Sequence, residues 1–150
     1  MAGLREEKRC AKMISAAVMC LALNLYFEAR SESIAGQLMV GFSTMNRVAD
    51  TRYPNTVCGV VKQANYHAWD DKNPIRHKCQ YSWFCDGMSD VPKNNKAMLE
   101  ATILAQNIYY GKVTDISQGA THYFADWIEP PYWAADMKLV NHIDQHLFYR

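Results

Sequence analysis

A single glutamate, Glu28, ends an apolar stripe in the first part of the chain. Steps of three and four residues back from it reach four apolar side chains, Leu25, Leu21, Val18 and Ile14. All five positions share one face of a helix. A carboxyl at the edge of a core loses solvation of its charged form, so its pKa rises and it can hold a proton near neutral pH. Such a group suits general-acid cleavage of a bond between two sugars, whereas a helix cap or a pair with Arg30 is the structural alternative.

Polar and aromatic side chains that suit sugar binding follow along the chain. Gln80, Ser82 and Trp83 fall in a run that alternates aromatic and polar residues, which predicts a strand over 80–84. On a strand, Gln80 and Ser82 would point into the same cleft, although a structural edge strand is the alternative. The four tryptophans, Trp69, Trp83, Trp127 and Trp133, offer flat surfaces for sugar rings or anchors for a core.

The elements that must position these residues can be predicted from periodicity and turn residues. Helices are expected over 8–29, 33–49, 57–63 and 96–110, the last ended by Gly111. Short strands are expected over 80–84, 120–125 and 142–149, with a helical turn over 132–137 and an irregular loop over 65–79. This pattern predicts an α+β fold, mainly helical, with a small antiparallel sheet. No linker or repeat interrupts it, so residues 1–150 are expected to form one domain.

Composition limits the class of partner. With 49% apolar residues in 150, the chain can bury a core without metal or disulfide support. The net charge is +1, and no basic stripe appears beyond 5–12, which argues against nucleic-acid binding. No coiled-coil seam is visible, so a monomer is expected. A nearly neutral chain is compatible with a glycan.

The five cysteines, Cys10, Cys20, Cys58, Cys79 and Cys85, show no zinc-ribbon or Cys-x-x-Cys spacing. The odd count favours free, buried thiols and synthesis in a reducing cytosol. A bridge between Cys79 and Cys85 in an oxidising compartment is the alternative.

The first residues imitate a signal peptide without completing one. A basic run over 5–12 precedes an apolar run over 13–25, but that run is shorter than the roughly 20 residues of a membrane span. Its removal would also remove the helix that carries Glu28. We therefore interpret it as part of a catalytic helix, with no stable membrane insertion.

Several segments together resemble the SleB family of cell-wall hydrolases, the spore cortex-lytic enzymes and their relatives. They are Ala22-Leu-Asn-Leu-Tyr-Phe-Glu-Ala-Arg-Ser-Glu32, Gly36-Gln37, Met45-Asn-Arg-Val48, Tyr53-Pro-Asn-Thr-Val-Cys-Gly-Val-Val61, Cys79-Gln-Tyr-Ser-Trp83, Gly119-Ala-Thr-His-Tyr-Phe124, Trp133 and His146-Leu-Phe-Tyr-Arg150. The blocks keep the family's order over about residues 20 to 150. Phe27 and Ser31 stand where the family usually has glycines, and Asp144 replaces another.

The resemblance implies a lysozyme-like fold that acts on peptidoglycan glycan strands without a cofactor. It implies a lytic transglycosylase with one glutamate, Glu28, which cleaves the bond from N-acetylmuramic acid to N-acetylglucosamine and leaves a 1,6-anhydro sugar. The residues expected to line the groove are Asn46, Gln80, Ser82, Trp83, His122, Tyr123 and Trp133. Without an export signal, the chain resembles a phage endolysin, expected in the host cytoplasm until its release to the wall.

Three alternatives remain open. The same bond could be hydrolysed by a muramidase in which Glu28 directs a water. His142-x-Asp144-x-His146 could form a zinc site of a wall amidase or peptidase, although no His-Glu-x-x-His segment supplies a base. The chain could also be a wall-binding module without catalysis.

Overall fold

The structure, a computed structural model, describes residues 14–150. The elements in chain order are α2 (Ala16–Ala29), α3 (Ile34–Ala49), α4 (Val57–Val61), the 3₁₀ helix η1 (Ser82–Cys85), α5 (Asn95–Tyr109), β1 (His122–Ala125), the 3₁₀ helix η2 (Tyr132–Asp136), β2 (Leu139–Ile143) and β3 (His146–Tyr149). The mainly helical α+β fold is as predicted. The first six residues of the helix expected over 8–29 lie outside the described residues, and the described helix begins at Ala16.

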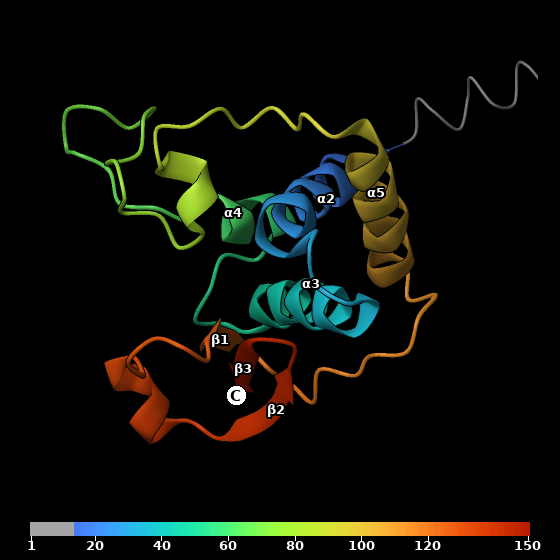
Figure 1. The fold of residues 1–150 in the computed structure, drawn as a ribbon. Helices are drawn as coiled ribbons and strands as arrows, with labels where there is room; N and C mark the ends of the chain where they lie inside the picture. Colours follow the sequence, from blue (N-terminus) through green and yellow to red (C-terminus); the bar gives the residue numbers. More distant parts are fainter. Residues whose placement is uncertain (1–13) are drawn as a thin grey trace, which may run out of the picture.

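Helix α2 is the centre of the helical part of the molecule. It contacts α3, α4 and α5, which surround it in Figure 1. The Ser15 hydroxyl caps its first turn by accepting the amide of Val18 at 3.2 Å. Val18, Leu21 and Leu25 are buried, as the stripe predicted. Burial of this stripe against three helices holds Glu28, in the last turn, in a fixed place.

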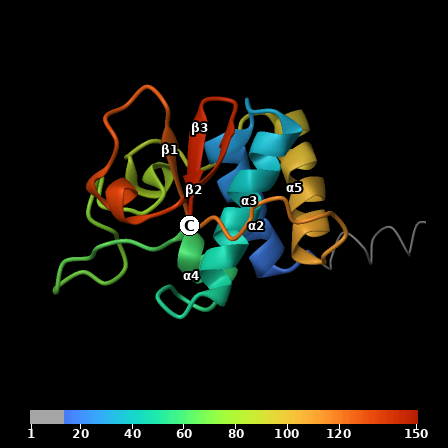
Figure 2. The same cartoon turned by 90° about the horizontal axis from the view of Figure 1, so that it is seen from below.

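Helix α3 lies between α2 and the sheet, as Figure 2 shows from a second direction. The Ser33 hydroxyl accepts the amide of Gly36 and caps its first turn. Gly41 permits a close helix crossing, because a Cβ there would overlap the Ile108 side chain of α5. The α3 helix can therefore pack on two helices and still present its opposite side to the strands.

The small sheet is antiparallel and has the strand order β1-β3-β2. The single strand expected over 142–149 is wrong: this segment is split into the end of β2 and all of β3. Asp144 in the turn between them has a φ of 52°, a left-handed conformation that a continuous strand cannot contain. Tyr123 pairs with Phe148 in the register of β1 and β3, so the middle strand holds the backbone at Tyr123.

The strand expected over 80–84 is also wrong, because residues 82–85 form the 3₁₀ helix η1. The alternation had a real basis, since Tyr81, Trp83 and Cys85 are buried while Ser82 is exposed. A disulfide between Cys79 and Cys85 closes this segment into a compact loop. Burial at every second residue is here produced by a tight loop over the core.

The expectation of free thiols is wrong for the described cysteines. Cys20 of α2 is bonded to Cys58 of α4, and the Cys79–Cys85 alternative is formed. Cys10 lies outside the described residues. Such bonds are typical of proteins in oxidising environments. No helix in the described part of the chain is long and apolar enough to cross a membrane.

Candidate active site

Glu28 lies half-buried in the last turn of α2. The phenol of Tyr123, on β1, donates a hydrogen bond of 3.0 Å to its Oε2. Burial raises the pKa of Glu28 above its ordinary value, while the Tyr123 hydrogen bond and the charge of Arg47 lower it in part. This environment favours a proton on Glu28 but also provides partners for the carboxylate that remains once the proton has left.

Tyr123 also packs against the middle strand of the sheet. Its ring lies 5.4 Å from that of Phe148 and 5.6 Å from that of His146, both on β3. Burial and the nearby Glu28 carboxyl raise the pKa of Tyr123 well above its ordinary value. The phenol is therefore protonated at neutral pH and acts as a hydrogen-bond donor to Glu28.

Arg47 is a buried cation that reasoning from the sequence did not single out. Its side chain lies on α3 at 3% exposure, and its Nε donates to the carbonyl of Thr121 at 2.6 Å. The guanidinium also lies over the rings of Tyr53 and Tyr81, at 5.1 and 5.6 Å from their centroids. Its buried Nη1 has no hydrogen-bond partner within residues 14–150. The positive charge therefore remains available to stabilise negative charge on Glu28.

A second carboxylate, Glu32, follows Glu28 by one helical turn in sequence but lies beyond the end of α2. Its Oε1 is 3.6 Å from Nδ1 of His146, and both side chains are only 17% exposed. Burial and the neighbouring Asp144 carboxyl raise the pKa of Glu32. Because His146 also contacts the ring of Tyr123, the Glu32–His146 pair is next to the Glu28–Tyr123 pair.

The residues of the suggested zinc motif turn to separate partners. His142 pairs with Asp126 at 2.9 Å, and His146 with Glu32. The carboxylate of Asp144 accepts the amide and hydroxyl of Ser33, at the first turn of α3. Within residues 14–150, no group of three or more His, Cys, Asp or Glu side chains is arranged to hold a metal ion.

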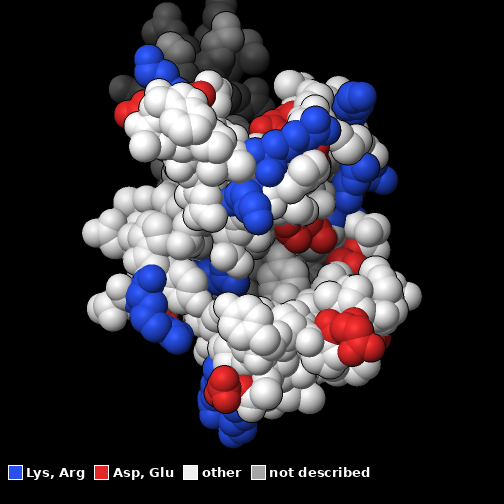
Figure 3. Space-filling view, turned by 90° about the vertical axis from the view of Figure 1, so that its left-hand side faces the viewer, with Lys and Arg blue, Asp and Glu red and all other residues white. Residues whose placement is uncertain are grey.

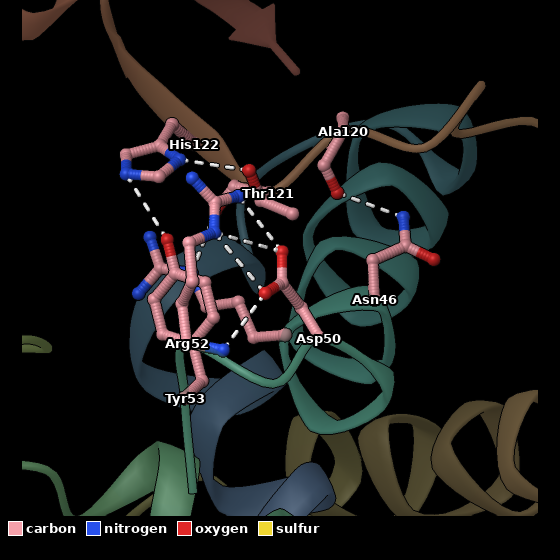
Figure 4. Close-up of polar contacts among 8 residues, drawn as sticks. Asn46, Asp50, Arg52, Tyr53, Ala120, Thr121 and His122 are labelled. Atoms are coloured by element: carbon pink, nitrogen blue, oxygen red, sulfur yellow. Dashed lines mark hydrogen bonds and ion pairs between the residues drawn. The ribbon is translucent and has the colours of Figure 1, made fainter.

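Asn46 and His122 fix the segment that leads into β1 (Figure 4). The amide nitrogen of Asn46 donates to the Ser117 hydroxyl at 2.9 Å and to the carbonyl of Ala120 at 2.8 Å. His122 lies between the Thr121 hydroxyl, at 2.8 Å, and the Tyr53 phenol, at 3.3 Å. These contacts join α3 and its following turn to the strand that carries Tyr123, one residue further along.

His122 is held in its neutral form. Burial and the charges of Arg47 and Arg52 lower its pKa to about 4, and Asp50 opposes this only in part. Its ring lies 4.9 Å from that of Trp133, on η2. His122 and Trp133 thus lie next to each other, as two neighbouring candidates for the groove.

Trp83 is 7% exposed and packs beside the end of α2 that carries Glu28. Its indole nitrogen donates to the buried amide oxygen of Asn24 at 2.9 Å, and its ring stacks on Phe27 at 4.8 Å and 17°. Asn24 in turn donates to Thr44 at 3.3 Å. Trp83 therefore supports the helix end that presents Glu28.

Gln80 and Ser82 are exposed, and the change from strand to 3₁₀ helix removes the reason to place them on one cleft face. Gln80 lines a separate, polar hollow with Gln63 and Asn65. Figure 3 shows one face of the molecule hollowed near its middle, with acidic side chains at the edge of the hollow and Lys and Arg side chains above it. Of the predicted groove residues, only Tyr123 is hydrogen-bonded to Glu28.

The site thus contains one half-buried acid, at the end of the central helix, that accepts a hydrogen bond from a phenol of the three-stranded sheet. Residues 31–149 match the family model described as Cell Wall Hydrolase, so the chain belongs to the cell wall hydrolase family. The matched segment begins three positions after Glu28.

Two solved structures share the fold. The catalytic domain of the Bacillus cereus SleB protein is 24% identical, with a TM-score of 0.63 over 89% of this chain and 89% of that one. The catalytic domain of the germination-specific lytic transglycosylase SleB from Bacillus anthracis is 23% identical, with a TM-score of 0.63 over 92% of this chain and 98% of that one. No curated protein matches the sequence significantly.

Proposed function

We propose that this protein is a lytic transglycosylase that cleaves the bond from N-acetylmuramic acid to N-acetylglucosamine in peptidoglycan. The observation that carries the proposal is the environment of the half-buried Glu28. Burial raises the pKa of this residue, and its carboxylate accepts a hydrogen bond from Tyr123. The family supports cell-wall breakdown. The similar fold of a domain described as a lytic transglycosylase supports this choice of reaction.

The reaction needs one residue that first gives and then takes a proton. Protonated Glu28 donates to the bridging oxygen, the bond from that oxygen to muramyl C1 breaks, and positive charge develops at C1. The Glu28 carboxylate then accepts the proton of the muramyl C6 hydroxyl. The C6 oxygen bonds to C1 and closes the 1,6-anhydro ring. Atoms and charge balance without a water molecule.

Tyr123 and Arg47 assist through Glu28. The Tyr123 phenol keeps one carboxylate oxygen in place, so the other is left for the bridging oxygen and later for the C6 hydroxyl. The buried charge of Arg47 stabilises the carboxylate that exists between the two proton transfers. Neither residue needs to touch the sugar.

Hydrolysis to a reducing sugar is the second candidate, and one observation favours it. Glu32 and His146 form a carboxylate–imidazole pair next to Tyr123. Such a pair is able to orient and deprotonate a water molecule. In that case Glu28 would remain the acid and water would take the place of the C6 hydroxyl.

Mass spectrometry of purified peptidoglycan digested by the wild-type protein and by Glu28→Gln tests the proposal. Anhydro-muramyl products that fall by a factor of roughly 10²–10⁴ in the variant are expected. Reducing-end muramyl products would select hydrolysis, and Glu32→Gln would then abolish them. Released peptides with intact glycan, or full activity of Glu28→Gln, would refute a glycosidase that depends on Glu28.

The cytoplasmic storage suggested by the resemblance to endolysins is a separate proposal. Both disulfides would then form only after release from the reducing cytosol. Alkylation of free thiols in intact producing cells tests it. Four reactive thiols at positions 20, 58, 79 and 85 are expected before lysis, and protected cysteines in living cells would contradict it.

A further inference from the structure

A cavity of about 250 Å³ lies beside Phe27, the residue that precedes Glu28. Its lining includes Tyr26, Phe27, Arg30, Trp83, Asp86 and Lys93. It is distinct from the Glu28–Tyr123 contact, because neither of those residues lines it. The mechanism above does not use it.

The floor of this cavity is aromatic and rigid. Phe27 and Trp83 stack with their centroids 4.8 Å apart, and Trp83 is fixed by its bond to the buried Asn24. Met88 and Val91, at 76% and 69% exposure, add apolar surface at the rim. Two exposed apolar side chains next to a preformed aromatic floor are typical of a binding surface.

Two cations, Arg30 and Lys93, stand at the cavity and are positioned by one residue. The Tyr26 hydroxyl accepts a hydrogen bond from the Arg30 guanidinium, which also lies over the Tyr26 ring at 4.6 Å. The same hydroxyl accepts the backbone amide of Lys93 at 3.2 Å. Arg30 and the start of the Lys93 side chain are thereby fixed on one side of the cavity.

One carboxylate, Asp86, completes the charges of the cavity. Its Oδ1 accepts the backbone amide of Met88 at 2.8 Å, which holds the residue in place at the rim. The cavity thus offers two positive charges, one negative charge and an apolar floor. A ligand that complements it carries carboxylates, one ammonium group and small apolar side chains.

We propose that this cavity binds the peptide branch of the muramyl sugar, so that the enzyme recognises glycan strands that still carry their stem peptides. This inference rests on the proposed function. A stem peptide joins the lactyl group of muramic acid and contains free carboxylates, a diamino acid and alanine methyl groups. Its carboxylates pair with Arg30 and Lys93, its free amino group pairs with Asp86, and its methyl groups lie on Phe27 and Trp83.

The position and size of the cavity agree with this ligand. Glu28 and Arg30 are two residues apart on a helix end whose full diameter is about 10–12 Å. Phe27 lines the cavity and is the direct neighbour of Glu28 in the chain, so the cavity begins beside the residue that carries the acid. At about 250 Å³ the cavity is smaller than the roughly 300–1,000 Å³ of most small-ligand pockets, so it accommodates one part of the branch and leaves the rest in solvent.

The experiment compares two substrates that differ only in the branch. Glycan strands with stem peptides and the same strands stripped by an amidase are digested by the wild-type protein and by Arg30→Gln, Lys93→Gln and Val91→Asp. Val91 is exposed, so its carboxylate adds repulsion without disturbing the core. Lys112→Gln is the matched control, because Lys112 lies just past the far end of α5, about 22 Å from Lys93 along that helix.

We expect each of the three cavity variants to raise the KM for peptide-bearing strands roughly three- to tenfold and to leave kcat unchanged. The KM for stripped strands should already be high in the wild-type protein and should not change further. Lys112→Gln should match the wild type on both substrates. Equal wild-type KM values for the two substrates, or variants with unchanged KM on both, would overturn the proposal.

Binding is measured separately, so that failure of the cavity and failure of the catalytic assignment can be distinguished. Calorimetry measures the affinity for a soluble muramyl tripeptide and for N-acetylmuramic acid, and neither measurement requires cleavage. The tripeptide should bind the wild-type and Glu28→Gln proteins more tightly than the sugar does, and Val91→Asp should remove that difference. Equal binding of the two ligands refutes the peptide site, whereas a lack of glycan cleavage with preferential tripeptide binding refutes only the reaction.

Discussion

Tyr123 and Glu28 are separated by 95 residues in the chain, yet the phenol oxygen of Tyr123 lies 3.0 Å from Oε2 of Glu28. This bond joins the end of the central helix to the first strand of the sheet. It therefore couples the protonation of the acid to the docking of a separate part of the fold.

Tyr123→Phe removes that bond and keeps the ring. The pKa of Glu28 then rises further, because the bond favours the carboxylate. Since the protonated acid is the active form, the high-pH limb of kcat/KM should move to higher pH. The loss of one charge-assisted hydrogen bond, about 1.5 kcal/mol, should lower kcat roughly tenfold. If the pH–rate profile of the variant has its high-pH limb at the same pH as that of the wild type, Tyr123 does not act through Glu28.

Arg47→Met and Arg47→Lys separate charge from packing. Both variants lose the Nε bond to the Thr121 carbonyl, so denaturant unfolding should show a loss of about 1–3 kcal/mol in each. Only Arg47→Met removes the cation that lowers the pKa of Glu28, so only that variant should move the high-pH limb upward. Identical limbs in the two variants would assign Arg47 a purely structural role.

His122→Gln should flatten the dependence of stability on pH. The unfolded chain binds a proton at His122 below about pH 6.5, whereas the folded chain does so only below about pH 4. Wild-type stability should therefore decrease as the pH falls through this window, and the variant should lose that part of the decrease. Urea unfolding at pH 4.5 and pH 7 measures the difference. An equally steep loss in the variant would mean that His122 is not held neutral.

The two disulfides should contribute unequally. Loop-closure entropy predicts about 4 kcal/mol for the Cys20–Cys58 bond, with a separation of 38 residues, and about 2 kcal/mol for Cys79–Cys85, with a separation of 6. Paired Cys→Ser variants in denaturant unfolding test this order. Each pair serves as the control for the other, and a larger loss for the short loop would contradict the entropic account.

The helices were predictable because their burial follows a simple period. The stripe that ends at Glu28 required only the spacing of three and four residues and an acid at its end. Gly111, with a φ of 69°, follows α5 as its position in the sequence predicted. Tyr123 could be placed near the groove only through its family motif, since nothing local links it to residue 28.

The remaining parts depend on contacts that a local pattern does not contain. Cys20 and Cys58 meet only because α2 and α4 pack together. Residues 80–84 alternate in burial without a partner strand. The alternating pattern therefore predicted correctly which side chains are buried, but it predicted a strand where the backbone forms a 3₁₀ helix. A signal for Arg47 did exist, because it follows the buried Val40 and Thr44 at helical spacing. An arginine on an apolar stripe marks a buried charge, just as Glu28 does.

The sheet and the residues just before it are joined to the helices by the buried Phe148 of β3 and by a few polar bonds: those from Glu28 to Tyr123, from Arg47 to Thr121, from Asn46 to Ala120 and from Ser33 to Asp144. A sheet attached in this way can detach as one cooperative unit while the helical core stays folded. Detachment would leave Glu28 without the phenol that orients it. On heating, activity should therefore be lost at a lower temperature than helical structure. In hydrogen exchange, the amides of β1 and β3 should open together, with a lower free energy of opening than the amides of α2.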